Sequence, residues 1–132
     1  TVMSTLSVGT IKSISSAAPV FQNTSGVEKG QLVKLWLDYN GSTNSILDSF
    51  NVSSVTDSGT GQYTVNWSSN AANGNYCTVF GAIHTQGVVI SHPSIRDPGQ
   101  VTKGTSSFRV DVLNSAGSFV DINRVDVACL GD

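Results

Sequence analysis

The sequence predicts an all-β fold: an antiparallel β-sandwich, with a jelly-roll-like arrangement as one possible form. Apolar and polar residues alternate in short runs, which places one face of each strand on a core. Turns rich in Gly, Asn and Ser separate these runs at close spacing. Helix signals are nearly absent, because no long window keeps an apolar period of about 3.6 residues. The 132 residues are enough for one domain with a hydrophobic core.

Residues 1–30 are Ser-rich and weakly patterned. Leu6, Val8 and Ile11 indicate one short strand, and residues 19–22 indicate another. The start of the chain lacks both a basic segment and an apolar h-region, so we expect no signal peptide. We predict that residues 1–30 form an N-terminal arm or docking segment and that residues 31–132 form the β-sandwich.

The strongest alternation lies in residues 33–39, 63–68 and 108–112. One face of each run is apolar and is expected to pack in the core. Trp67 shares its parity with Val65, so it is expected in the core as well. The predicted core positions are Leu35, Leu37, Val65, Val110 and Val127.

Turn chemistry divides the runs. Residues 40–42, Asn-Gly-Ser, end the first long strand. Residues 57–61 join the run 50–56 to the run 62–68, which predicts a hairpin with a loop of about five residues.

Two phase changes in the alternation predict β-bulges. Phe50 and Val52 share a face, whereas Val55 is three positions after Val52, so a bulge is expected at residues 53–54. A second change of parity, between Ile122 and Val125, predicts a bulge at residues 123–124.

Composition and charge narrow the possible partners. Charged residues make up 12% of the chain, the net charge is −2 and there is no basic run, so no nucleic-acid partner is expected. No apolar stretch approaches the roughly 20 residues of a membrane span, so no membrane insertion is expected. Cys77 and Cys129 are too few for a disulfide framework. They are either two buried free thiols or a single disulfide.

The chain offers little catalytic or metal-binding chemistry. His84 and His92 are the only histidines, and neither has a Cys, Asp or Glu beside it at a metal-ligand spacing. A Gly-x-Ser-x-Gly motif is absent, and Glu28 is the only glutamate. We therefore expect no enzymatic activity, no metal and no cofactor.

Trp36 is the most informative single residue. Its parity places it with Lys34 and Asp38, opposite the apolar face of the same strand. Three interpretations are open: a strand buried on both faces, a subunit interface, and a ligand-stacking platform. The subunit interface is favoured, since buried aromatic residues anchor interfaces. We take Trp36, Lys34 and Asp38 as candidate binding or interface residues.

A second candidate region is the segment 91–104, which carries two prolines and two glycines. This composition predicts a long surface loop, and such loops often carry function. His92, Arg96 and Asp97 lie within it and are included as candidate binding residues.

Residues 33–67 resemble a domain of bacteriophage tail-fibre and other virion appendage proteins, notably those of phages that infect marine bacteria. The matching stretches are residues 34–41 (KLWLDYNG), 48–57 (DSFNVSSVTD) and 59–67 (GTGQYTVNW). Residues 9–13 and 19–22 are similar to the approach to this domain, and residues 125–131 to its final strand. The resemblance implies a protein of the virion surface that is trimeric and has no known catalysis.

The function expected from this resemblance is a fibre-tip or knob module on the phage particle. It would form a homotrimer, contact other virion proteins and bind a bacterial cell-surface glycan or protein by multivalent contact. One alternative is a capsid decoration or cement protein anchored by its N-terminal arm. Another is a stand-alone carbohydrate-binding module.

Overall fold

A computed structural model describes residues 7–12, 21–26, 28–30, 32–83, 87–91 and 103–131. The chain divides into two units, Thr1–Leu32 and Val33–Asp132. Within the described ranges every regular element is a β-strand, and every strand pairing is antiparallel. These ranges contain no helix with the length and apolarity that a membrane span requires. The predicted all-β class is confirmed.

The N-terminal unit contains one short strand pair, β1 (Phe21–Gln22) with β2 (Glu28–Gly30). The turn after β1 is closed by a hydrogen bond from Gly26 N to Asn23 O at 3.0 Å. The predicted strand at residues 19–22 is thus found at its last two residues. The strand expected around Val8 and Ile11 is not found, since residues 7–12 form none. Both side chains are exposed.

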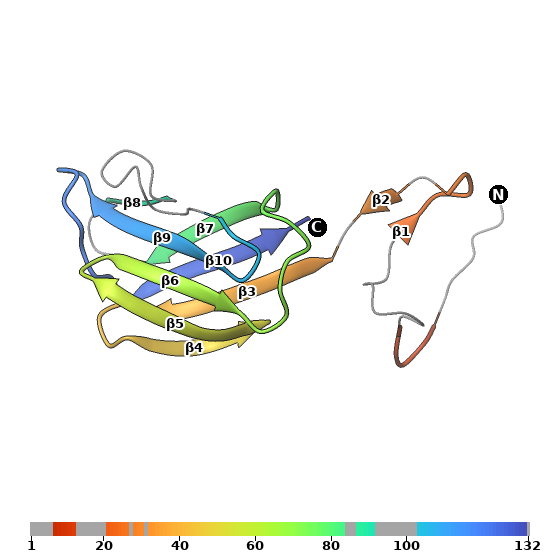
Figure 1. Ribbon diagram of the computed structural model, residues 1–132, viewed down its shortest axis with the longest axis horizontal. Helices are drawn as coiled ribbons and strands as arrows, with labels where there is room; N and C mark the ends of the chain where they lie inside the picture. The colour runs from red at the N-terminus through yellow and green to blue at the C-terminus, as the bar shows by residue number, and fades with distance from the viewer. Residues whose placement is uncertain are drawn as a thin grey trace. The chain divides into compact units, whose positions relative to one another are not determined.

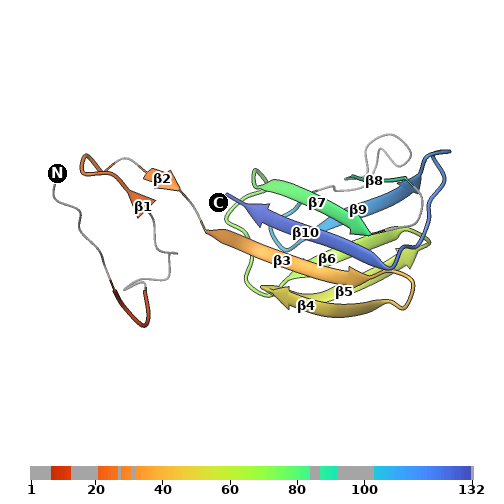
Figure 2. The same cartoon turned by 180° about the vertical axis from the view of Figure 1, so that it is seen from behind.

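The second unit is a sandwich of two four-stranded sheets (Figures 1 and 2). The first sheet has the order β4-β3-β10-β7 and consists of β3 (Val33–Asn40), β4 (Ser45–Phe50), β7 (Cys77–Ile83) and β10 (Arg124–Leu130). The second sheet has the order β5-β6-β9-β8 and consists of β5 (Val52–Gly59), β6 (Gln62–Trp67), β8 (Val88–Ser91) and β9 (Ser107–Asn114). The predicted antiparallel sandwich is therefore confirmed.

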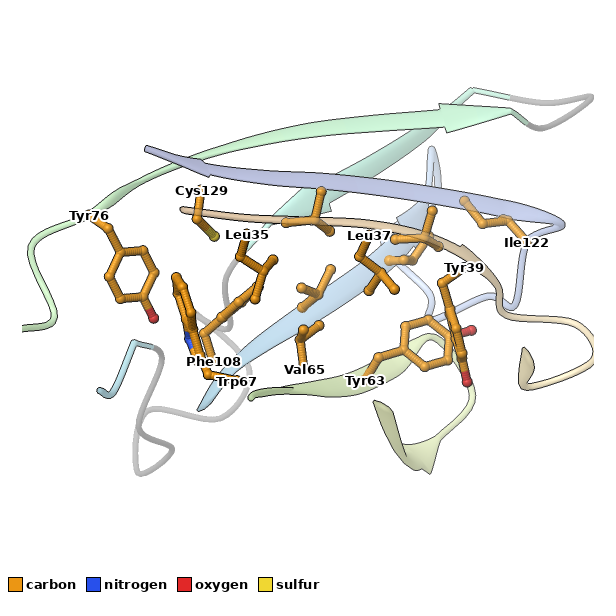
Figure 3. Close-up of a cluster of buried hydrophobic side chains, with 14 residues drawn as sticks. Leu35, Leu37, Tyr39, Tyr63, Val65, Trp67, Tyr76, Phe108, Ile122 and Cys129 are labelled. Carbon is orange, nitrogen blue, oxygen red and sulfur yellow. The ribbon is translucent and has the colours of Figure 1, made fainter. Parts of the chain in front are cut away.

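The hydrophobic core lies between the two sheets (Figure 3). All five predicted core residues are at most 3% exposed, and Trp67 is 5% exposed. Aromatic rings fill both ends of the cluster. Tyr39 meets Tyr63 edge-on at 5.1 Å, and at the other end Trp67 packs edge-on against Tyr76 at 5.2 Å. Such edge-to-face pairs are favourable beyond the area they bury.

Asn51 is the corner at which the chain passes from the first sheet to the second. It has a φ of 60°, a left-handed conformation that Asn tolerates better than most residues. Its side-chain amide donates to Lys34 O at 2.9 Å and accepts from Ser69 N at 2.7 Å. The expectation that residues 50–56 form one run is therefore wrong, because Phe50 ends β4 and Val52 begins β5.

The first predicted bulge is confirmed, and the second is wrong. The register of β5 against β6 shifts between Val52 and Ser54, and the two strands form the predicted hairpin with a tighter turn at residues 60–61. At the second site the parity change does not lie within one strand. Ile122 is buried but precedes β10, which begins at Arg124.

The two cysteines are free thiols, which excludes the disulfide. Cys129 is buried on the core face of β10, as expected. Cys77 is exposed, contrary to expectation. In the register of β7 against β10, Cys77 lies opposite Leu130 rather than Cys129, so the two thiols belong to opposite faces of the sheet.

A polar network closes the end of the sandwich at Tyr63. The Tyr63 hydroxyl donates to Asp121 Oδ1 at 2.7 Å, and Gly61 N donates to the same oxygen at 2.7 Å. Burial is the largest cause that raises the pKa of Tyr63 well above its ordinary value, and the hydrogen bond to Asp121 is the second. Gly41 lies directly against this hydroxyl, because a Cβ at position 41 would stand 2.3 Å from Tyr63 Oη.

Candidate functional site

Trp36 lies on the outer face of the first sheet, the face turned away from the core. Its neighbours in β3, Leu35 and Leu37, are buried in the core, whereas Trp36 is 37% exposed. This exposure contradicts the interpretation of β3 as a strand that is buried on both faces. A tryptophan with this exposure leaves a large, mostly apolar ring system available for contact.

An apolar row crosses the outer face, with one residue from each strand. Phe50, Trp36, Ala128 and Val79 lie directly opposite one another in the register of β4, β3, β10 and β7. With strands about 4.8 Å apart, the row extends over about 14 Å. Phe50 is 53% and Val79 is 54% exposed. Figure 2 shows β3, β10 and β7 side by side on this face of the sandwich.

A shallow groove of about 360 Å³ lies in the middle of this face. It is lined by residues 36–38 of β3, 79–81 of β7 and 126–128 of β10. The side chains explain the hollow. Ala128 carries only a methyl group and Gly81 no side chain, whereas Trp36 and Val79 project on either side. The lining is mainly apolar, with carboxylates as its charged groups.

An acidic row runs beside the apolar row. Asp48, Asp38 and Asp126 lie opposite one another in β4, β3 and β10. Like charges in directly opposed positions destabilise a sheet. Arg124 offsets part of this repulsion, because its guanidinium donates to Asp38 Oδ2. The other carboxylate oxygen, Asp38 Oδ1, is buried and accepts no hydrogen bond from the described residues.

Asp126 is the second carboxylate of the groove and lies opposite Gly81 on β7. No hydrogen bond or ion pair joins its side chain to any residue in the described ranges. A Cβ at position 81 would stand 3.3 Å from Asp126 Cβ and 3.4 Å from Asp126 Oδ2. Glycine at this position therefore keeps the space beside the carboxylate open.

The predicted site residues fall into two groups. Trp36 and Asp38 line the groove, and Lys34 lies on the same face of β3, partly buried and outside the groove. His92, Arg96 and Asp97, like His84, lie outside the described residues.

Val79, Gly81, Asp126 and Ala128 were missed in the sequence analysis. The alternation of residues 125–129 already assigns Asp126 and Ala128 to the outer face. Alternation does not show that β10 pairs with β3 and β7, and this pairing is what brings the four residues next to Trp36.

The groove offers contacts of the kind that a recognition site uses. Among the described residues no group of three or more His, Cys, Asp or Glu side chains could hold a metal ion. An exposed indole can stack on an apolar ligand face, and carboxylate oxygens accept hydrogen bonds from hydroxyl groups. The arrangement therefore offers one stacking surface with two acceptor groups beside it.

Comparisons with known proteins add one similarity. No protein-family model matches the chain, and no curated protein matches it. A solved structure that is similar is the phiAB6 tailspike in complex with three-repeated oligosaccharides of Acinetobacter baumannii surface polysaccharide. The identity is 19% and the TM-score is 0.41, over 92% of this chain. The chain spans 30% of the tailspike chain.

Proposed function

We propose that this protein is a host-attachment module of a phage virion, a fibre tip or knob that binds a bacterial surface glycan in the Trp36 groove. The observation that carries the proposal is an exposed tryptophan beside a groove of about 360 Å³ that holds two carboxylates. The location on the virion is supported by the resemblance of residues 33–67 to phage appendage domains.

The acidic row favours a glycan over a subunit interface at this face. In an interface core Asp38 and Asp126 would lose their hydration, and charged groups are depleted from such cores for this reason. A sugar can instead supply a hydroxyl donor to each carboxylate while its apolar face stacks on Trp36.

Affinity would come from multivalency. One shallow groove with a single stacking residue gives weak binding, since little of the ligand is buried. In the homotrimer that the resemblance implies, three grooves act together. Linked sites exceed the single-site affinity by about 10²- to 10⁴-fold where the geometry permits simultaneous contact. Sedimentation velocity of the full chain tests the trimer directly.

The subunit interface remains the second candidate, and the exposed apolar side chains of Phe50, Val79 and Ile83 favour it. In this case the face would pack on another copy of the chain, or on a capsid if the protein decorates one. The trimer would then dissociate when Trp36 is replaced by Ser.

Binding of the full chain to an array of purified bacterial surface polysaccharides tests the proposal. We expect at least one polysaccharide to bind, Trp36→Ala to abolish binding, and Phe50→Ala to preserve most of it. Phe50 is the matched control, because it is an exposed aromatic residue of the same row that lies outside the groove. Binding that survives Trp36→Ala, or no binding to any polysaccharide, would contradict the proposal.

A further inference from the structure

Asp126 is the carboxylate of the groove that forms no ion pair with any described residue. The Asp38 carboxylate is paired with Arg124, whereas Asp126, directly opposite on β10, has no such partner within the described ranges. Of the two carboxylates that line the groove, Asp38 therefore has a paired cation and Asp126 has none among the described residues.

The same charge faces the space in which a ligand would lie. Asp126 is part of the groove lining together with Trp36 and Asp38. On the β7 side the carboxylate meets Gly81, where a methyl group would already stand 3.4 Å from Asp126 Oδ2. Any larger side chain at this position would crowd the carboxylate and narrow the groove.

We propose that the groove selects a sugar residue with a free ammonium group, which lies against Asp126 while the apolar face of the ring stacks on Trp36. This inference rests on the proposed function and names its ligand class. A single ammonium group would supply the cation that Asp126 lacks. A uronic acid would be repelled by Asp126, and a neutral sugar would bind but leave Asp126 uncompensated.

Trisaccharides of glucosamine, N-acetylglucosamine and galacturonic acid test this selection, with affinity measured by NMR titration of the full chain. We expect the glucosamine trimer to bind about two- to fivefold more tightly than the neutral trimer, which is the range of a solvent-accessible ion pair. The advantage should vanish in about 1 M salt, where charges are screened within about 3 Å. The galacturonic acid trimer should bind most weakly.

Two matched variants locate the effect. Asp126→Asn should remove the advantage of the glucosamine trimer over the neutral trimer, because the ammonium group then has no unpaired carboxylate to lie against. Asp48→Asn should preserve the advantage, because Asp48 belongs to the same acidic row but lies outside the groove. Neither variant should lower the melting temperature, because neither side chain is in the core and each change removes a like charge opposite Asp38.

The outcomes separate this inference from the proposed function. Equal binding of the glucosamine and neutral trimers, or no binding of the glucosamine trimer, would overturn the ammonium selection. An advantage that persists in Asp126→Asn would do the same. In each case the array result with Trp36→Ala would still decide whether the groove binds glycans at all.

Discussion

Replacement of Gly41 by Ala places a methyl group against Tyr63, whose hydroxyl donates to Asp121 at one end of the sandwich. The added Cβ would stand 2.3 Å from Tyr63 Oη, 2.9 Å from Tyr63 Cζ and 3.0 Å from Ile122 O. Ordinary contact begins at about 3.4 Å, so the tyrosine ring must move by roughly 1 Å. The φ of Gly41 adds no strain of its own, because it is not positive.

The expected cost has two sources. Overpacking a filled site costs about 1–3 kcal/mol. Movement of the ring also weakens the 2.7 Å bond from Tyr63 to Asp121, and a hydrogen bond to a charged group contributes about 1.5–3 kcal/mol. We therefore expect Gly41→Ala to lower the free energy of unfolding by about 3 kcal/mol, and Tyr63→Phe alone by about 2 kcal/mol.

A double-mutant cycle tests this mechanism, with each variant unfolded in urea and compared at an unchanged m-value. In the Tyr63→Phe background the closest clashing atom, Oη, is absent and the bond to Asp121 has already been lost. The double variant should therefore cost at least about 1 kcal/mol less than the sum of the single variants. Additive costs would refute the contact between Gly41 and the Tyr63 hydroxyl.

Three other predictions follow from particular contacts. Asn51→Ala should destabilise the protein by about 2 kcal/mol, measured by urea unfolding, because it loses the bonds to Lys34 and Ser69 at a positive φ; a wild-type midpoint would contradict the corner. Burial raises the pKa of the Cys129 thiol from 9.0 to about 12, so its contribution to stability is complete below pH 9 and is lost as pH rises toward 12. Cys129→Ala should therefore lose less stability over that interval, and equal losses would argue against a buried thiol. Gly81→Val should fill the groove and abolish glycan binding with little change in melting temperature, whereas unchanged binding would place the ligand elsewhere.

The parts of the fold that depend on local patterning were predictable from the sequence. Alternation with a period of two identified the core faces around Leu35, Val65 and Val110, and it placed Trp36 and Asp38 on the opposite face. The bulge at Ser53 was also predictable, because a bulge changes parity within a single strand.

The remaining features depend on relations that alternation does not encode. The corner at Asn51 is a local conformation with positive φ inside an apparently continuous strand pattern. The groove arises where β10 pairs with β3 and β7, and these pairings join segments that are distant in sequence. Asp126 and Gly81 could therefore be assigned to a face, but not to the neighbourhood of Trp36.

Acrylamide quenching of tryptophan fluorescence tests the central claim most directly. The chain has two tryptophans; Trp67 is 5% exposed and serves as the buried reference, whereas Trp36 is 37% exposed. The account predicts that Trp36 stays accessible to acrylamide at every protein concentration, and that a bound polysaccharide protects it. Protection of Trp36 that increases with protein concentration in the absence of glycan would identify this face as a subunit interface and contradict the account.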